Sequence, residues 1–255
     1  MTVVLETKAI SKSFGGVKAV DGVSFSIAAG ELLALIGPNG AGKTTCFNLL
    51  NGQLKPDTGD VFLSGEAITG LAPRVLARRG IGRTFQITAT YNSMTVRENV
   101  QTALIAAAHG EWRLIGSAER QHTEKANALL SLVGMQDQAN RACGVLAYGD
   151  LKRVELAVAL ANDPKLLLMD EPTAGMAPSE RIILMELAAD IAKSRHIAVL
   201  FTEHDMDVVF AHADRVIVLD RGQLIAQGSC AEVRANARVK AVYLGSGETY
   251  ADAEP

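Results

Sequence analysis

The sequence lacks the marks of a secreted, membrane-spanning or nucleic-acid-binding chain. It has three cysteines, Cys46, Cys143 and Cys230, which lie far apart and form no C-x-x-C pair, so we expect reduced, buried thiols in a cytosolic protein. No apolar run approaches the ~20 residues of a spanning helix, and the first residues do not form a signal peptide. The net charge of −3 provides no basic field for nucleic acid. Any membrane role would therefore come through a partner.

What is present is typical of one large folded α/β domain. The chain has 255 residues, of which 48% are hydrophobic, enough for an extensive buried core. Only seven prolines and no low-complexity tract occur, which argues against disorder.

Strand-like and helix-like segments alternate along the chain. Residues 3–28 have strand character, with an expected turn at Asp21-Gly22. Residues 87–161 are mostly helical in pattern, which predicts a helical insertion between two core segments, 1–86 and 162–255. The alternation predicts a parallel sheet with helices on both faces. The remaining expected strands cover 31–36, 59–70, 81–86, 165–171, 197–201, 215–219 and 223–227, and the expected helices 72–79, 179–193 and 205–212.

A glycine-rich loop follows the first buried strand of this pattern. It fits G-x-x-x-x-G-K-[ST], the phosphate-binding loop, between an apolar strand and an apolar helix start. Backbone N–H groups and the helix dipole at such a loop attract anions, and glycines allow close approach of the backbone to a ligand. Lys43 can reach phosphates, and the Thr44 hydroxyl can ligate Mg²⁺. The predicted nucleotide-binding residues of the loop are Gly37, Pro38, Asn39, Gly40, Ala41, Gly42, Lys43, Thr44 and Thr45.

Polar residues end three other expected strands, and ligands of open α/β sheets lie at these strand ends. Asp170 is placed to hold Mg²⁺, and Glu171 to act as the general base that polarises a water molecule. Gln86 could orient water or Mg²⁺. His204 follows the next strand, and a lone histidine is more often a capping or structural group than a catalyst.

A second loop opens a helix with the residues Leu146, Ala147, Tyr148, Gly149 and Asp150. The N-terminus of this helix is a second anion-binding site, but the chain has only one phosphate-binding loop to supply a nucleotide. This mismatch hints at a dimer with nucleotide at the interface. Phe14, before Gly15-Gly16, is either a packing residue in a loop or an aromatic that stacks on adenine.

From residue 3 to residue 245 the chain resembles the ATP-binding cassette (ABC) ATPases, with the motifs in their order. The resemblance implies a P-loop NTPase core with a mixed or antiparallel β subdomain and an inserted helical subdomain. It also implies ATP and Mg²⁺ as cofactors, and a head-to-tail dimer in which each signature loop meets the partner's ATP. By this resemblance Phe14 stacks on adenine, residues 37–44 form the Walker A loop, and Gln86 is the glutamine of the Q-loop. Residues 146–150 form the signature loop, and Asp170-Glu171 is the Walker B pair with its catalytic glutamate. Residues 174–178 form the D-loop, and His204 is the switch histidine.

Finer features resemble the ATPases of branched-chain (hydrophobic) amino acid importers. These are the stretches 82–86, 94–100, 146–149, 203–206 and 241–245. The resemblance implies a location on the inner face of the cell membrane and two permease subunits that dock near 86–100. It further implies a second, different ATPase subunit and, indirectly, a periplasmic solute-binding protein. Urea or amide importers and lipopolysaccharide exporters are the related alternatives.

Non-transport ATPases of this fold fit less well, because they usually carry coiled coils or zinc modules that this chain lacks.

Three positions depart from the family pattern. Ala147 replaces a serine, Asp150 a glutamine, and Ala177 an aspartate or asparagine. Ala147 removes a hydroxyl donor to phosphate. Asp150 is either a helix N-terminal acid, worth ~0.3–1 kcal/mol, or a carboxylate that weakens the ATP site it faces. Asp150 and Ala177 together could make the two ATP sites of a dimer unequal.

Overall fold

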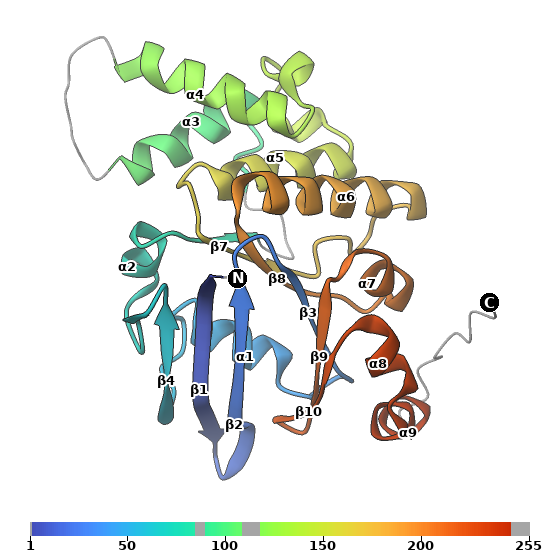
Figure 1. Cartoon of the computed structure of the whole chain (residues 1–255). Helices are drawn as coiled ribbons and strands as arrows, with labels where there is room; N and C mark the ends of the chain where they lie inside the picture. The colour runs from blue at the N-terminus through green and yellow to red at the C-terminus, as the bar shows by residue number, and fades with distance from the viewer. Residues whose placement is uncertain (1, 85–89, 109–117, 246–255) are drawn as a thin grey trace.

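The computed structural model describes residues 2–84, 90–108 and 118–245. Two sheets and a layer of helices make up this part of the chain (Figure 1). Gln86 lies outside the described residues, so its predicted role is not assessed.

The central sheet has six strands in the order β10-β9-β3-β8-β7-β6. Neighbours from β9 to β6 pair in parallel, and β10 pairs antiparallel with β9. All five residues of β3 are buried, as expected for a strand covered on both faces. The strands are β3 (Leu32–Ile36), β6 (Ile81–Thr84), β7 (Leu166–Asp170), β8 (Ala198–Thr202), β9 (Arg215–Asp220) and β10 (Gln223–Gly228).

The second sheet is antiparallel, in the order β2-β1-β4-β5. Its strands are β1 (Val3–Phe14), β2 (Val17–Ala28), β4 (Thr58–Leu63) and β5 (Glu66–Ala67). The predicted turn at Asp21-Gly22 is wrong, because the hairpin turns at Gly15-Gly16, where both glycines have positive φ. Asp21 and Gly22 instead form a β-bulge opposite Ser11, whose hydroxyl accepts a hydrogen bond from the Gly22 N–H (2.9 Å).

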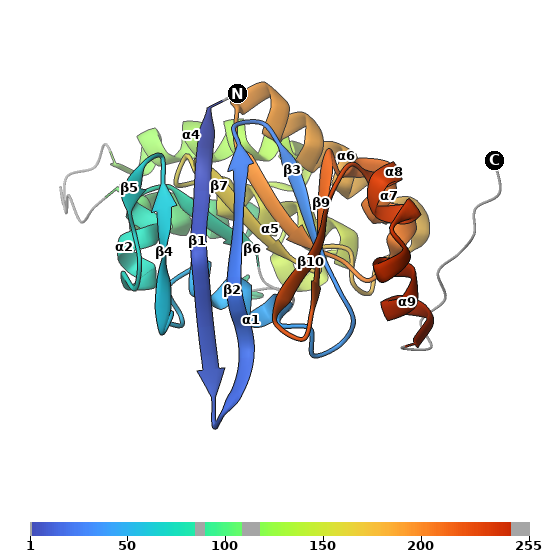
Figure 2. The ribbon, with the colours of Figure 1, turned by 60° about the horizontal axis from the view of Figure 1, so that its bottom comes forward.

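Helices lie on both faces of the central sheet, as expected, but on one face an antiparallel sheet shares the cover with α1. One face, through Leu32, Ala34 and Ile36, packs on the helical layer. The other face, through Leu33 and Leu35, packs on α1 and the antiparallel sheet (Figure 2). The hairpin strands supply this cover because their apolar residues alternate with polar ones, which gives the sheet one buried face. The helices are α1 (Lys43–Leu50), α2 (Pro73–Arg78), α3 (Val96–Ala107), α4 (Ala118–Leu132), α5 (Tyr148–Leu160), α6 (Pro178–Arg195), α7 (Met206–His212), α8 (Cys230–Ala235) and α9 (Ala237–Gly245).

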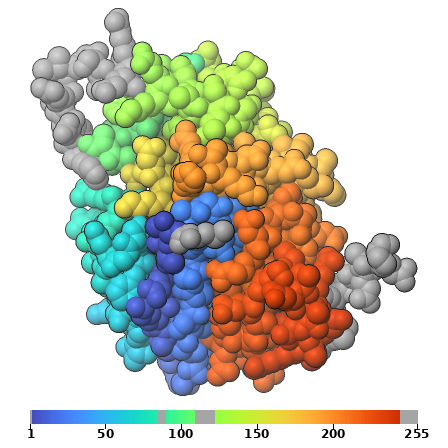
Figure 3. All heavy atoms as spheres, in the orientation of Figure 1, coloured from blue at the N-terminus to red at the C-terminus, as the bar shows by residue number. Residues whose placement is uncertain are grey.

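Helices α3, α4 and α5 lie above α6, at the top of Figures 1 and 3. They fall within 87–161, where the sequence predicts a helical insertion; its boundaries as a subdomain stay a prediction. No helix of the described residues is both long and apolar enough to cross a membrane. Cys46 and Cys143 are buried as expected, whereas Cys230 is only half-buried.

Candidate functional site

The glycine-rich loop connects β3 to α1, as predicted. A Cβ atom at Gly37 would lie 2.2 Å from the Leu219 carbonyl oxygen, and one at Gly42 would lie 2.2 Å from the Ala19 carbonyl oxygen. Of the three glycines of this loop, only Gly40, where φ is +79°, would place a Cβ atom in open space. Gly37 and Gly42 make room for the chain's own backbone, and Gly40 is the one whose missing side chain leaves the outer surface of the loop open.

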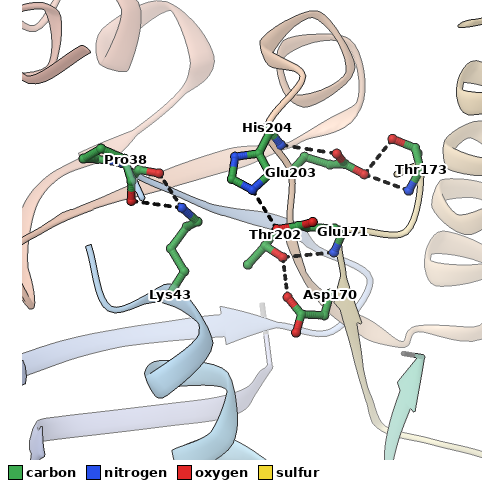
Figure 4. Close-up of polar contacts among 9 residues, drawn as sticks. Pro38, Lys43, Asp170, Glu171, Thr173, Thr202, Glu203 and His204 are labelled. Atoms are coloured by element: carbon green, nitrogen blue, oxygen red, sulfur yellow. Dashed lines mark hydrogen bonds and ion pairs between the residues drawn. The ribbon is translucent and has the colours of Figure 1, made fainter. Parts of the chain in front are cut away.

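Lys43 begins α1, and its side chain folds back over the loop. It is 8% exposed, and its ammonium group donates hydrogen bonds to the carbonyl oxygens of Gly37 and Pro38 (Figure 4). The cation is thereby held inside the curl of the loop, where the N-terminus of α1 adds its partial positive charge. Thr44 is exposed in the first turn of α1 and Thr45 is half-buried. Full burial raises the pKa of the next residue, Cys46, to about 12, so its thiol is inert.

Asp170 ends β7 opposite Thr202, the last residue of β8. Its Oδ1 atom accepts a hydrogen bond from the Thr202 hydroxyl (2.8 Å), and its Oδ2 atom lies 3.4 Å from a guanidinium nitrogen of Arg83 on β6. Arg83 also donates to the Gln53 side chain (2.8 Å). The carboxylate therefore faces a cation and a hydroxyl to which the sequence alone assigned no role. The position of Arg83 in the strand before Gln86 was the available sequence signal.

Glu171 turns away from Asp170 toward His204 (Figure 4). Its Oε1 atom lies 2.6 Å from Nε2 of His204, and which atom carries the proton depends on the tautomer. Glu171 has a positive φ of 47°, and its N–H donates to the Thr202 hydroxyl (3.0 Å). The strained backbone directs the carboxylate across the strand ends. The structure thus brings together Asp170, Glu171 and His204, at the sheet edge where the sequence places them.

A divalent cation fits this site only with help from other ligands. No group of three or more histidine, cysteine, aspartate or glutamate residues that could hold a metal occurs in the described ranges. Asp170 and the Thr44 hydroxyl are hard oxygen donors of the kind Mg²⁺ prefers. Because Mg²⁺ commonly takes one or two protein ligands plus phosphate oxygens and water, this sparse donor set suits Mg²⁺ bound together with a nucleotide.

The second loop, 146–150, begins α5 at Tyr148 with Ala147 as its N-cap residue. Buried Gly149 lies against α6, since a Cβ atom there would lie 3.0 Å from Oε1 of Glu180. Tyr148 lies over Gly175 in the turn after β7. Asp150 stands in the first turn of α5. This loop therefore contacts the segment that follows the Asp170-Glu171 pair.

Phe14 is the last residue of β1, not part of a loop as expected, because the strand continues to the hairpin turn. The residue is 47% exposed, and the Lys12 ammonium lies 5.7 Å from the ring centroid. The same hairpin touches the phosphate-binding loop where Ala19 meets Gly42.

Sequence reasoning gave no role to Glu203, which is 4% exposed. Burial raises the pKa of its carboxyl group, against the lowering effect of hydrogen bonds from Thr173. A charged residue directly after a fully buried strand was the signal that could have found it.

Comparison with known proteins agrees with this arrangement. Residues 20–174 match the family model of the ABC transporter, and residues 223–249 match that of the branched-chain amino acid ATP-binding cassette transporter. The chain is 37% identical to the high-affinity branched-chain amino acid transport ATP-binding protein BraF of Pseudomonas aeruginosa, over 95% of this chain and 98% of that protein.

Solved structures give the same result. The chain is similar to the ADP conformation of an ATP-binding cassette of an ABC transporter, with a TM-score of 0.85, 33% identity and coverage of 96% of this chain and 100% of that one. It is also similar to a dimeric cassette in a post-hydrolysis state bound to ADP and Pi, with a TM-score of 0.75, 26% identity and coverage of 89% and 98%. The fold, the loop and the carboxylate pair thus agree with the family match, and the chain belongs to the ABC transporter family, as one of its ATP-hydrolysing cassettes.

Proposed function

We propose that this chain is the ATP-hydrolysing subunit of an importer for branched-chain or other hydrophobic amino acids. The observation that carries the cargo class is the match of residues 223–249 to the branched-chain family model, at the C-terminal end where the general cassette model does not reach. Similarity to BraF along nearly the whole chain supports it.

The site residues divide the work of phosphoryl transfer. Lys43 and the backbone N–H groups of 37–45 bind the phosphates, and Phe14 stacks on the adenine ring. Glu171 is the general base, and His204, 2.6 Å from it, holds its carboxylate in place. Thr44, Asp170 and Gln86 would hold Mg²⁺, which supplies charge neutralisation at the phosphates.

A dimer completes the site. The contacts described for the 146–150 loop run to Glu180 and Gly175, on the segment after β7. We propose that residues 146–150 face the nucleotide of a second ATPase subunit. The dimeric cassette with ADP and Pi, to which this chain is similar, supports that assembly.

Two permeases would place the subunit on the inner face of the membrane, and a periplasmic solute-binding protein would select the cargo. The proposed docking region near 86–100 has an apolar neighbourhood. Tyr91 is 59% exposed and Val145 65% exposed, and their segments are joined by a hydrogen bond from the Gly144 N–H to the Asn92 carbonyl oxygen (3.0 Å). Exposed apolar side chains of this kind suit a protein interface.

The experiment is co-purification of the tagged chain with the products of neighbouring genes, followed by solute-stimulated ATPase assays. Two permeases, a second ATPase and stimulation by leucine, isoleucine or valine with their binding protein are expected. Stimulation by urea or an amide, or association with lipopolysaccharide-export subunits, would replace the proposed cargo with one of the related alternatives.

A further inference from the structure

Two turns at the sheet edge are joined residue by residue. One follows β7 and leads into α6, and the other follows β8 and leads into α7. Four consecutive residues, from the end of β8 into the second turn, contact the end of β7, the first turn or the start of α6: Thr202 contacts Asp170, Glu203 contacts Thr173, His204 contacts Glu171, and Asp205 contacts Arg181.

The contact of Glu203 is the most buried of these. Its Oε1 atom accepts hydrogen bonds from both the N–H (2.9 Å) and the hydroxyl (2.7 Å) of Thr173, which is 1% exposed. Its Oε2 atom accepts a hydrogen bond from the N–H of His204 (3.3 Å). One carboxylate therefore holds the start of the turn 173–177 and the backbone of His204 at the same time (Figure 4).

Two hydrogen bonds of Arg181 fix the other end of the same turn. The Arg181 guanidinium donates through Nε to the Met176 carbonyl oxygen (2.9 Å) and through Nη1 to Oδ2 of Asp205 (2.6 Å). The turn 173–177 is thus anchored at both ends to the residues on either side of His204. A shift of this turn must move His204 or break these bonds, since buried polar contacts are costly to leave unmade.

We propose that Glu203 is a positioning residue for ATP hydrolysis. It couples the turn 173–177 to His204, and so sets the contact between His204 and Glu171. The turn 173–177 carries Gly175, over which Tyr148 lies, so displacement of the 146–150 loop would reach His204 along this path. The inference rests on the proposed roles of Glu171 and His204.

The test uses the full-length chain and three variants. Glu203→Gln loses the acceptor for the His204 N–H, Thr173→Val loses the buried hydroxyl at nearly constant volume, and Thr173→Ser keeps it. We expect Glu203→Gln and Thr173→Val each to lower kcat about tenfold, the cost of one buried hydrogen bond in the transition state, with KM for ATP nearly unchanged. Thr173→Ser, which keeps the hydroxyl, should hydrolyse ATP at nearly the wild-type rate. Combining Glu203→Gln with Thr173→Val should lower kcat no further than the worse single variant, because both interrupt the same path from the turn 173–177 through Glu203 to His204.

Hydrogen exchange supplies a second readout. Glu203→Gln should raise exchange in the turn 173–177, and Thr173→Val should raise it at 203–205. Glu31→Gln is the control, because Glu31 is another partly buried carboxylate held by a polar contact, with Arg215 (2.7 Å), but at the opposite ends of the strands of the central sheet. It should lower thermal stability without a selective loss of kcat.

Wild-type turnover in Glu203→Gln and Thr173→Val would overturn the proposal, and so would a loss of kcat that only follows the loss of thermal stability, as in the control. Glu171→Gln, assayed in parallel, distinguishes a failure of the proposed role of Glu171 from a failure of the coupling through Glu203. If that variant hydrolyses ATP normally, the proposed role of Glu171 fails. If it is inactive while the Glu203 and Thr173 variants are normal, only the coupling fails.

Discussion

His204 Nε2 and Glu171 Oε1 lie 2.6 Å apart, although the two residues come from different strand ends of the central sheet. The contact depends on the left-handed backbone of Glu171, which turns its carboxylate away from Asp170. Asp170 and Glu171, although adjacent in the chain, therefore contact different neighbours: Asp170 contacts Thr202 and Arg83, and Glu171 contacts His204.

Glu171→Gln should bind ATP but lose at least about 100-fold in turnover, because an amide cannot accept the proton of the attacking water. The variant should accumulate an ATP-dependent dimer, which size-exclusion chromatography with and without MgATP would detect. Hydrolysis at the wild-type rate would show that Glu171 is not the base. The isolated wild-type chain should hydrolyse ATP slowly, with a specific rate that rises with protein concentration.

Gly42→Ala should destabilise the fold by about 2–5 kcal/mol, since it combines backbone strain at positive φ with overlap on the Ala19 carbonyl. Gly40→Ala is the matched variant, because its Cβ atom meets open space and only the strain of about 1–2 kcal/mol remains. Urea unfolding measures both. We expect Gly40→Ala to weaken ATP binding instead, and equal unfolding midpoints for the two variants would contradict the structural difference.

Asp150→Gln should raise the ATPase rate of the assembled transporter, because it removes a carboxylate from the loop proposed to face the partner's triphosphate. Asp150 also stands in the first turn of α5, where its charge stabilises the helix by about 0.3–1 kcal/mol. The variant should therefore be slightly less stable and more active. Unchanged turnover would leave Asp150 with the helix-stabilising role alone.

The pH dependence of stability should differ between wild type and Glu203→Gln. Burial raises the folded-state pKa of Glu203 above its unfolded value of 4.5, so the folded state binds the proton more tightly. Between the two pKa values this group makes stability fall as pH rises. Glutamine does not titrate, so the unfolding free energy of Glu203→Gln should improve relative to wild type as pH increases above 4.5. Chemical unfolding across this range measures the difference, and a constant difference would contradict the raised pKa.

Sequence reasoning placed the phosphate-binding loop and the Asp170-Glu171 pair because their chemistry requires a local order of residue types. It missed Arg83 and Glu203, whose roles depend on pairing between strands far apart in the chain. It also misplaced the hairpin turn, since Gly15-Gly16 and Asp21-Gly22 are both turn-forming pairs. Only the register against β1, which pairs Lys12 with Val20, selects one as the turn and the other as a bulge.

The N-terminus of α6 carries an incomplete cap that Ala177→Asn should complete. Glu180 already accepts a hydrogen bond from the Ala177 N–H (3.3 Å), but alanine has no side-chain acceptor to return to the helix. Asparagine supplies it, and we expect a gain of about 0.5–2 kcal/mol in unfolding free energy.

Ala72→Asn is the control for this variant, because Ala72 is the N-cap residue of α2 and likewise makes no side-chain cap. Both variants should raise the urea midpoint. Only Ala177→Asn should also lengthen the lifetime of the ATP-bound dimer, since Ala177 lies in the D-loop segment 174–178, which we propose contacts the partner subunit. If the two variants change dimer lifetime equally, residue 177 acts through helix stability alone, and any inequality of the two ATP sites would have to come from Asp150.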